Sequence, residues 1–156
     1  MGEKKRRMAA GHFPKSSAEA RLEAQLASCR EECRSLAQLI AAQPGNGEAL
    51  YQLSVNRHLM SVVHRELQHR PELIAENLNR ALETITDAIS MAPQNDAYWV
   101  HFAECIKLAE LQLPLTDRAR ETLSMALAHP AVPPQSLITP IVALARSHPS
   151  LSLIHI

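Results

Sequence analysis

Apolar positions recur with helical spacing along most of this chain. After Ser16 they follow one another at intervals of four, three, four, three and four residues, a heptad stripe on one helix of about 26 residues. Ser16 with Glu19 forms a capping box that predicts the start of this helix, and Pro44 with Gly45 predicts its end. The stripe consists of Leu22, Leu26, Cys29, Cys33, Leu36 and Ile40.

The same periodicity, interrupted by short turns rich in proline, predicts five more helices. Their expected ranges are about Gly47–His69, Pro71 to near Pro93, Asp96–Leu111, Thr116 or Asp117 to about Ala128, and Pro133 or Pro134 to near Ser147, with a kink at Pro140. No stretch alternates with a period of two for long enough to form a strand. The predicted fold class is all-α, with antiparallel helix pairs in an array of about six helices.

Two prolines begin similar stretches, at Pro44 and Pro93. Bulky apolar residues fall six and nine positions after each proline, and a small residue falls ten positions after it. A helix places these positions on one face, where a small residue lets a partner helix approach closely. These positions are Leu50, Leu53 and Ser54 in the first stretch and Trp99, Phe102 and Ala103 in the second, with Ala81, Ile85 and Ala88 continuing the pattern before Pro93.

Across Pro44–Phe102 this pattern resembles the tetratricopeptide repeat, a helix–turn–helix unit of about 34 residues. The two prolines are 49 residues apart (93 − 44), so the repeat is lengthened by about 15 residues around His58–Asn79. Leu39 also stands where Ala88 would correspond, so the repeat is degenerate. The resemblance implies a tetratricopeptide-like helical array that holds peptides or partner domains in a concave groove.

Composition supports a helical domain and argues against several other classes. The 156 residues are 46% hydrophobic and only 3% aromatic, and they carry 16 basic and 16 acidic side chains. The run Lys4–Arg7, with Glu3, gives the first seven residues a charge of +3 (four minus one), so the rest is −3. A neutral body with few aromatic residues favours no nucleic-acid partner. Residues 1–15 are interpreted as a disordered basic lead.

No signal peptide, membrane-spanning segment or disulfide framework is evident. Three cysteines are an odd number, and no segment approaches the roughly 18 apolar residues that a membrane helix needs. A cytoplasmic location, without membrane attachment, is the expectation.

The cysteines and histidines that approach a site motif fit no metal centre. Cys29 and Cys33 fall on the heptad stripe, and Leu36 stands where a third thiolate would be needed, so they are interpreted as buried structural thiols. His64 and His69 are five residues apart, which would turn them about 140° from each other on one helix. His58 shares a face with His69, but about 16 Å along that helix separates them, which is too far to share one metal ion. All three are therefore expected to be exposed surface histidines.

Other candidate groups also fit structural roles. The four glycines form no phosphate-binding loop. Glu31 and Glu32, or Glu72 and Glu76, are expected on solvated helix faces, and Trp99 in the core. The sequence therefore predicts no catalytic, cofactor-binding or metal-binding residue and no cofactor.

The end of the chain suggests a fragment. Leu151–Ile156 resembles a translated sequencing adapter, so residues 16–150 are taken as the helical domain, 151–156 as a non-native tail, and the natural protein is expected to continue beyond about Ser150. The last helix would then bury one face poorly.

Three functions remain open. The first is a non-catalytic interaction or scaffold module, whose partner would be a protein, a peptide or a downstream domain of the same chain. The second is an appendage of a transferase, because Trp99–His148 resembles helical regions that precede transferase domains, methyltransferases first, in some bacterial proteins. The third is a dimerisation module that uses the Leu22–Ile40 stripe, although we expect the stripe to pack within the chain, leaving a monomer or weak homo-oligomer.

Overall fold

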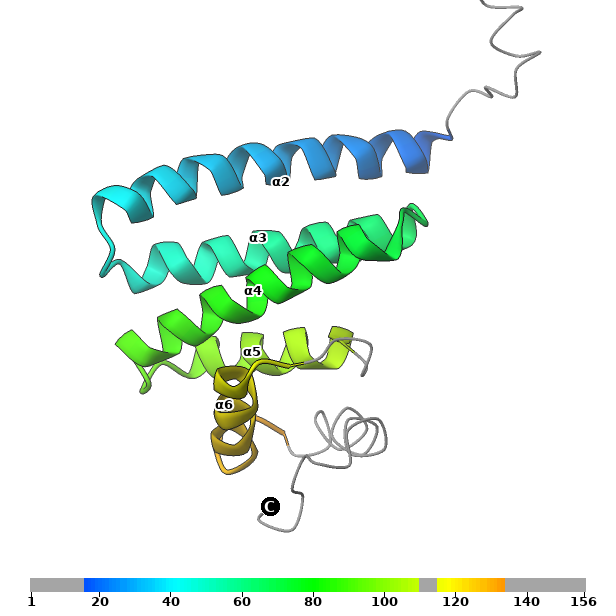
Figure 1. Cartoon of the computed structure of the whole chain (residues 1–156). Helices are drawn as coiled ribbons and strands as arrows, with labels where there is room; N and C mark the ends of the chain where they lie inside the picture. Colours follow the sequence, from blue (N-terminus) through cyan, green and yellow to red (C-terminus); the bar gives the residue numbers. More distant parts are fainter. Residues whose placement is uncertain (1–15, 110–114, 134–156) are drawn as a thin grey trace, which may run out of the picture.

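The computed structural model describes residues 16–109 and 115–133, and these residues form five helices and no strand. The helices are α2 (Ser17–Ala42), α3 (Gly47–Glu66), α4 (Pro71–Met91), α5 (Asp96–Ala109) and α6 (Asp117–Leu127) (Figure 1). The all-α prediction is confirmed. The expected last helix, the basic lead and the segment 151–156 lie outside the described residues.

Side-chain caps fix the starts of three helices. The backbone N–H of Glu19 donates to Ser16 Oγ over 3.0 Å, that of Ala49 to Asn46 Oδ1 over 3.0 Å, and that of Ala119 to Thr116 Oγ1 over 3.1 Å. Each bond satisfies one of the backbone donors that have no partner in the first helical turn. Pro71 occupies the first turn of α4, where its missing N–H removes no helical bond.

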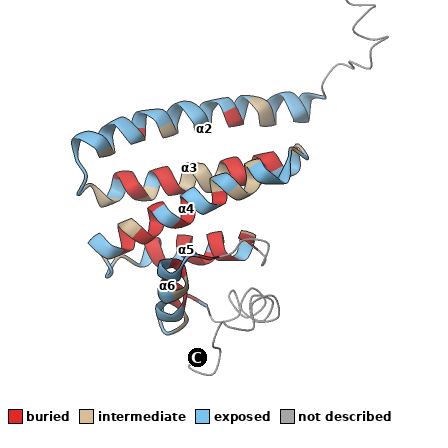
Figure 2. Cartoon of the chain, in the orientation of Figure 1, coloured by how far each residue is buried: buried red, intermediate tan, exposed pale blue. Residues whose placement is uncertain are grey.

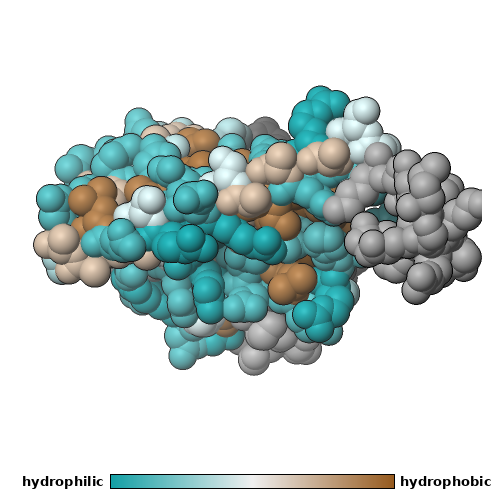
Figure 3. Space-filling view, turned by 90° about the horizontal axis from the view of Figure 1, so that it is seen from above, coloured by the Kyte–Doolittle hydropathy of each residue, from teal (hydrophilic) through white to brown (hydrophobic). Residues whose placement is uncertain are grey.

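Successive helices pack against one another as layers (Figure 1). Helix α2 lies on α3, α3 on α4 and α4 on α5, while α6 runs across the others and contacts α4 and α5. The surface on the α2 side is mostly hydrophilic, with scattered hydrophobic residues (Figure 3). Within the described ranges, no helix is long and apolar enough to cross a membrane.

The core lies between α3, α4, α5 and α6, where the buried residues of Figure 2 face one another. The repeat positions Leu50, Leu53, Trp99 and Phe102 are all buried, as the proline-based pattern predicts. Ala81 and Ala88 have no exposed surface, because α4 is enclosed by neighbouring helices at both positions.

The heptad stripe of α2 packs against α3 within the same chain, which confirms the intramolecular prediction. Leu26 and Cys29 form a cluster with Met60 and Val63, and Leu36 forms another with Ala49 and Leu53. The stripe is therefore already covered.

Helix α3 ends three residues before the predicted His69, in a turn that the sequence pattern missed. The backbone N–H of His69 donates to the carbonyl of His64 over 3.0 Å, and that of Gln68 donates to the carbonyl of Arg65 over 3.1 Å. This pair of bonds is the Schellman motif, which needs a left-handed residue after the helix. Gln68 supplies it with φ of 57°. Glycine is the usual residue at this position, so its absence left no signal in the sequence.

Candidate functional site

A row of polar side chains joins α3 to α4 through the middle of the fold. Ser54, Arg57 and Ser61 lie one turn apart on α3. Ser54 Oγ donates to the Ala81 carbonyl over 2.7 Å and Ser61 Oγ to the Ile74 carbonyl over 3.0 Å. Both serines are fully buried, so these bonds satisfy hydroxyls that would otherwise destabilise the fold. The row is a structural connection between the two helices.

His101 of α5 joins this row at Ser54. Its Nε2 lies 2.9 Å from Ser54 Oγ, and its Nδ1 lies 3.8 Å from a carboxylate oxygen of Glu104. The order serine, histidine, glutamate is that of a hydrolase triad. However, Ser54 Oγ donates its single hydroxyl hydrogen to the Ala81 carbonyl, so toward His101 it can only accept a hydrogen bond from an Nε2–H group. The histidine therefore does not activate this serine as a nucleophile.

Burial keeps His101 neutral. Burial, together with a smaller contribution from the neighbouring His58, lowers the pKa of His101 from 6.5 to about 4. The His58 ring meets the His101 ring edge-on at 5.5 Å between centroids, and Cys105 Sγ lies 3.5 Å from His101 Nε2. Desolvation also raises the pKa of the buried Cys105 thiol. The buried His101 imidazole and Cys105 thiol are therefore both in their uncharged forms near neutral pH.

The three histidines expected on the surface are not exposed, and this prediction is wrong. His64 is buried, while His58 and His69 are partly buried. The Nδ1 atoms of His64 and His69 lie 2.8 Å apart, although five residues of helix would separate their directions widely. The reason is the turn at Gln68, which folds His69 back over the last turn of α3. Burial lowers the pKa of His64, and His69 and Arg30 lower it further.

The burial predicted for the two cysteines of α2 is confirmed for Cys29 but only in part for Cys33. Cys29 is buried, and desolvation raises the pKa of its thiol. Cys33 is partly buried, with its Sγ 3.9 Å from Met60 Sδ. Burial raises the pKa of Cys33 as well, against an opposite effect of Arg57. Across the described residues, no group of three or more His, Cys, Asp or Glu side chains could hold a metal ion.

The remaining sequence candidates lie where they were expected. Glu31, Glu32, Glu72 and Glu76 are exposed, and Glu76 pairs with Arg80 one turn away at 2.9 Å. Trp99 is buried, donates from Nε1 to the Pro93 carbonyl over 2.7 Å, and stacks on His129.

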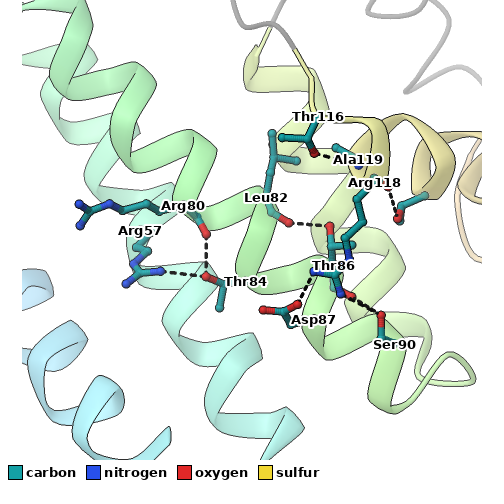
Figure 4. Close-up of polar contacts among 11 residues, drawn as sticks. Arg57, Arg80, Leu82, Thr84, Thr86, Asp87, Ser90, Thr116, Arg118 and Ala119 are labelled. Carbon is teal, nitrogen blue, oxygen red and sulfur yellow. Dashed lines mark hydrogen bonds and ion pairs between the residues drawn. The ribbon is translucent and has the colours of Figure 1, made fainter. Parts of the chain in front are cut away.

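The surface has a groove of about 510 Å³ between α4 and the start of α6. Leu82 and Leu115 supply buried apolar surface, and Glu83, Thr86 and Thr116 supply polar groups. The Arg118 guanidinium donates to Asp87 and, over 3.2 Å, to Ser90 Oγ, which links the two helices beside the groove (Figure 4). The remaining lining residues are Asn79 and Ala119.

A second groove, of about 310 Å³, lies between α2, α3 and α4. Four arginines line it, two from α2, one from α3 and one from α4, together with Asn77, Cys33 and Met60. These arginines are Arg30, Arg34, Arg57 and Arg80. Figure 4 shows Arg57 and Arg80 on the opposite side of α4 from Arg118.

Sequence reasoning missed both grooves. Arg30 and Arg34 are one turn apart, and this spacing alone indicates two positive charges on one face of α2. Nothing in the sequence places Arg57 and Arg80 beside them, because that depends on how three helices cross.

Comparison of the chain with protein-family models, with curated proteins and with solved structures finds no match.

Proposed function

We propose that this chain is a helical interaction module, tetratricopeptide-like in plan, that holds a segment of a polypeptide partner in the groove between α4 and α6. The observation that carries the proposal is the groove itself. Its volume of about 510 Å³ lies within the range of roughly 300–1,000 Å³ typical of ligand sites. Its lining combines apolar surface from Leu82 and Leu115 with hydrogen-bonding groups, a combination suited to a peptide backbone and side chains.

The packing of the helices supports the same function. Contacts run mainly between helices that follow one another in the chain, as in helical repeat proteins, which bind partners along extended surfaces. Ser54, His101 and Cys105, whose side-chain types often serve in catalysis, are buried and hydrogen-bonded in the core. Binding therefore fits this surface better than catalysis.

The test is selection of random displayed peptides on the folded chain, followed by affinity measurement through fluorescence polarisation. Asn79→Trp fills the groove from an exposed position of α4, and Gln38→Trp adds the same bulk to an exposed position of α2 outside the groove. We expect Asn79→Trp to weaken the selected peptides by about tenfold or more and Gln38→Trp to leave affinity within about twofold. Selected peptides that bind both variants equally well would disprove this assignment of the groove.

A further inference from the structure

The arginine groove gathers four guanidinium groups in a small space. Arg30 and Arg34 come from one face of α2, Arg57 from α3 and Arg80 from α4, around a volume of about 310 Å³. Arginines from three separate helices meet here, so the cluster results from tertiary packing. Each guanidinium offers up to five N–H donors in a planar fork that suits phosphate and carboxylate oxygens.

Arg57 is fixed in this groove before any ligand arrives. One of its terminal nitrogens donates to Thr84 Oγ1 over 2.8 Å, and Thr84 in turn donates to the Arg80 carbonyl over 2.6 Å (Figure 4). Burial lowers the pKa of Arg57, and the neighbouring Arg80 lowers it further, whereas Cys33 and Glu83 act in the opposite direction. A partly buried guanidinium beside a like charge is unfavourable by itself, and an anion between the two would relieve the repulsion.

Nearby carboxylates compensate the cluster only in part. Glu76 pairs with Arg80 at 2.9 Å, but both side chains are 56% exposed, and such surface pairs contribute little. Glu83 acts on Arg57 from α4. Arg30 and Arg34 form no ion pair among the described residues. Their donors are available to a ligand.

We propose that this groove binds a phosphate dianion, carried by a phosphorylated side chain of a polypeptide partner. Clusters of arginine recognise phosphorylated segments because a phosphate offers three strongly accepting oxygens and about two negative charges. The groove is compact and lies on a chain with no net charge, which fits one such group better than an extended nucleic-acid backbone. The inference rests on the proposed function, since it names the chemistry by which a partner segment is held at a second groove of the module.

The experiment compares a degenerate peptide library with a fixed central phosphoserine against the same library with serine, and against one with glutamate. Binding to the full chain is measured by fluorescence polarisation at low and high salt, with inorganic phosphate as competitor. The test variant is Arg30→Glu with Arg34→Glu. The matched control is Arg21→Glu with Arg70→Glu, an equal charge change at exposed positions outside the groove. Circular dichroism checks that both double variants keep their helices.

We expect phosphoserine to bind about tenfold or more tightly than serine, and this preference to weaken with salt. The Arg30/Arg34 variant should lose about tenfold or more in affinity, and the control variant about twofold or less. Arg57→Lys should also weaken binding, because lysine keeps the charge but loses the fork.

Three results would overturn the inference. They are equal affinity for phosphoserine and serine, equal loss in the test and control variants, and competition by inorganic phosphate as strong as that by the phosphopeptide, which would identify free phosphate as the ligand. The proposed function is tested separately by Asn79→Trp. Selected peptides that are sensitive to Asn79→Trp, with no phosphoserine preference, would leave that function standing and remove this inference.

Discussion

The Nδ1 atoms of His64 and His69 lie 2.8 Å apart across the turn that ends α3. At this distance one imidazole must donate and the other must accept, so the pair cannot hold a proton on both Nδ1 atoms. In the Schellman motif, side chains at these two positions normally form an apolar contact. Here two histidines take its place, and the contact depends on the left-handed backbone of Gln68.

Gln68→Gly should stabilise the chain by about 0.5–1 kcal/mol. A side chain at φ of 57° is unfavourable by roughly 1–2 kcal/mol, and glycine removes that cost. Part of the gain is offset because glycine loses more backbone entropy on folding than glutamine does. Urea unfolding at neutral pH measures the change. The control, Gln52→Gly, places the same substitution inside α3 and should destabilise by about 1 kcal/mol. A loss of stability in Gln68→Gly would contradict the left-handed turn.

Stability should fall as the pH is lowered from neutral to 5. His101 has a pKa of about 4 in the folded chain, against an ordinary histidine value of 6.5 for the unfolded chain. Burial also lowers the pKa values of His58 and His64. The unfolded chain therefore binds more protons than the folded chain in this window. The stabilising contribution is fully present above pH 6.5 and is lost as the pH falls towards 4. For His101 alone the loss at pH 5 is on the order of 2 kcal/mol.

Urea midpoints at pH 7.5 and 5.0 measure this dependence. His101→Gln, which removes the titrating ring but keeps an amide near Ser54, should reduce the difference between the two midpoints. A variant whose midpoints differ as much as those of the parent chain would show that His101 is not responsible.

Trp99→Ala should destabilise the fold by roughly 3–5 kcal/mol, because it removes a buried ring, its hydrogen bond to the Pro93 carbonyl and its stacking on His129. Trp99→Phe retains most of the apolar volume and serves as the comparison, with a smaller loss. Thermal unfolding followed by circular dichroism measures both. A loss within about 0.5 kcal/mol for Trp99→Ala would indicate a surface position instead.

Leu26→Asp should detach α2 from α3 without dissociating a dimer. Leu26 is buried against α3, with Met60 and Val63 in the same cluster, so a carboxylate there should destabilise by about 3 kcal/mol or more. Hydrogen exchange should accelerate in α2 more than in α4 and α5. Gln25→Asp, at an exposed neighbouring position, is the control. If the parent chain forms a dimer that Leu26→Asp converts to a folded monomer, the stripe has an intermolecular role.

The sequence by itself determined the helices, most of their ends and the identity of the core. Caps such as Ser16 and Thr116 act on backbone groups three residues away, and periodic burial is a property of a single helix, so both are local. For the same reason the burial of Trp99 and Phe102 followed from their spacing after Pro93.

Only the tertiary structure decided which polar side chains meet. Ser54 and His101 are 47 residues apart and lie 2.9 Å from each other, while the four groove arginines come from three helices. Such neighbours depend on how helices cross and on where a turn redirects the chain, as Gln68 does for His69. Periodicity specifies which face of a helix is buried, but crossing geometry depends on the summed packing of all the helices at once.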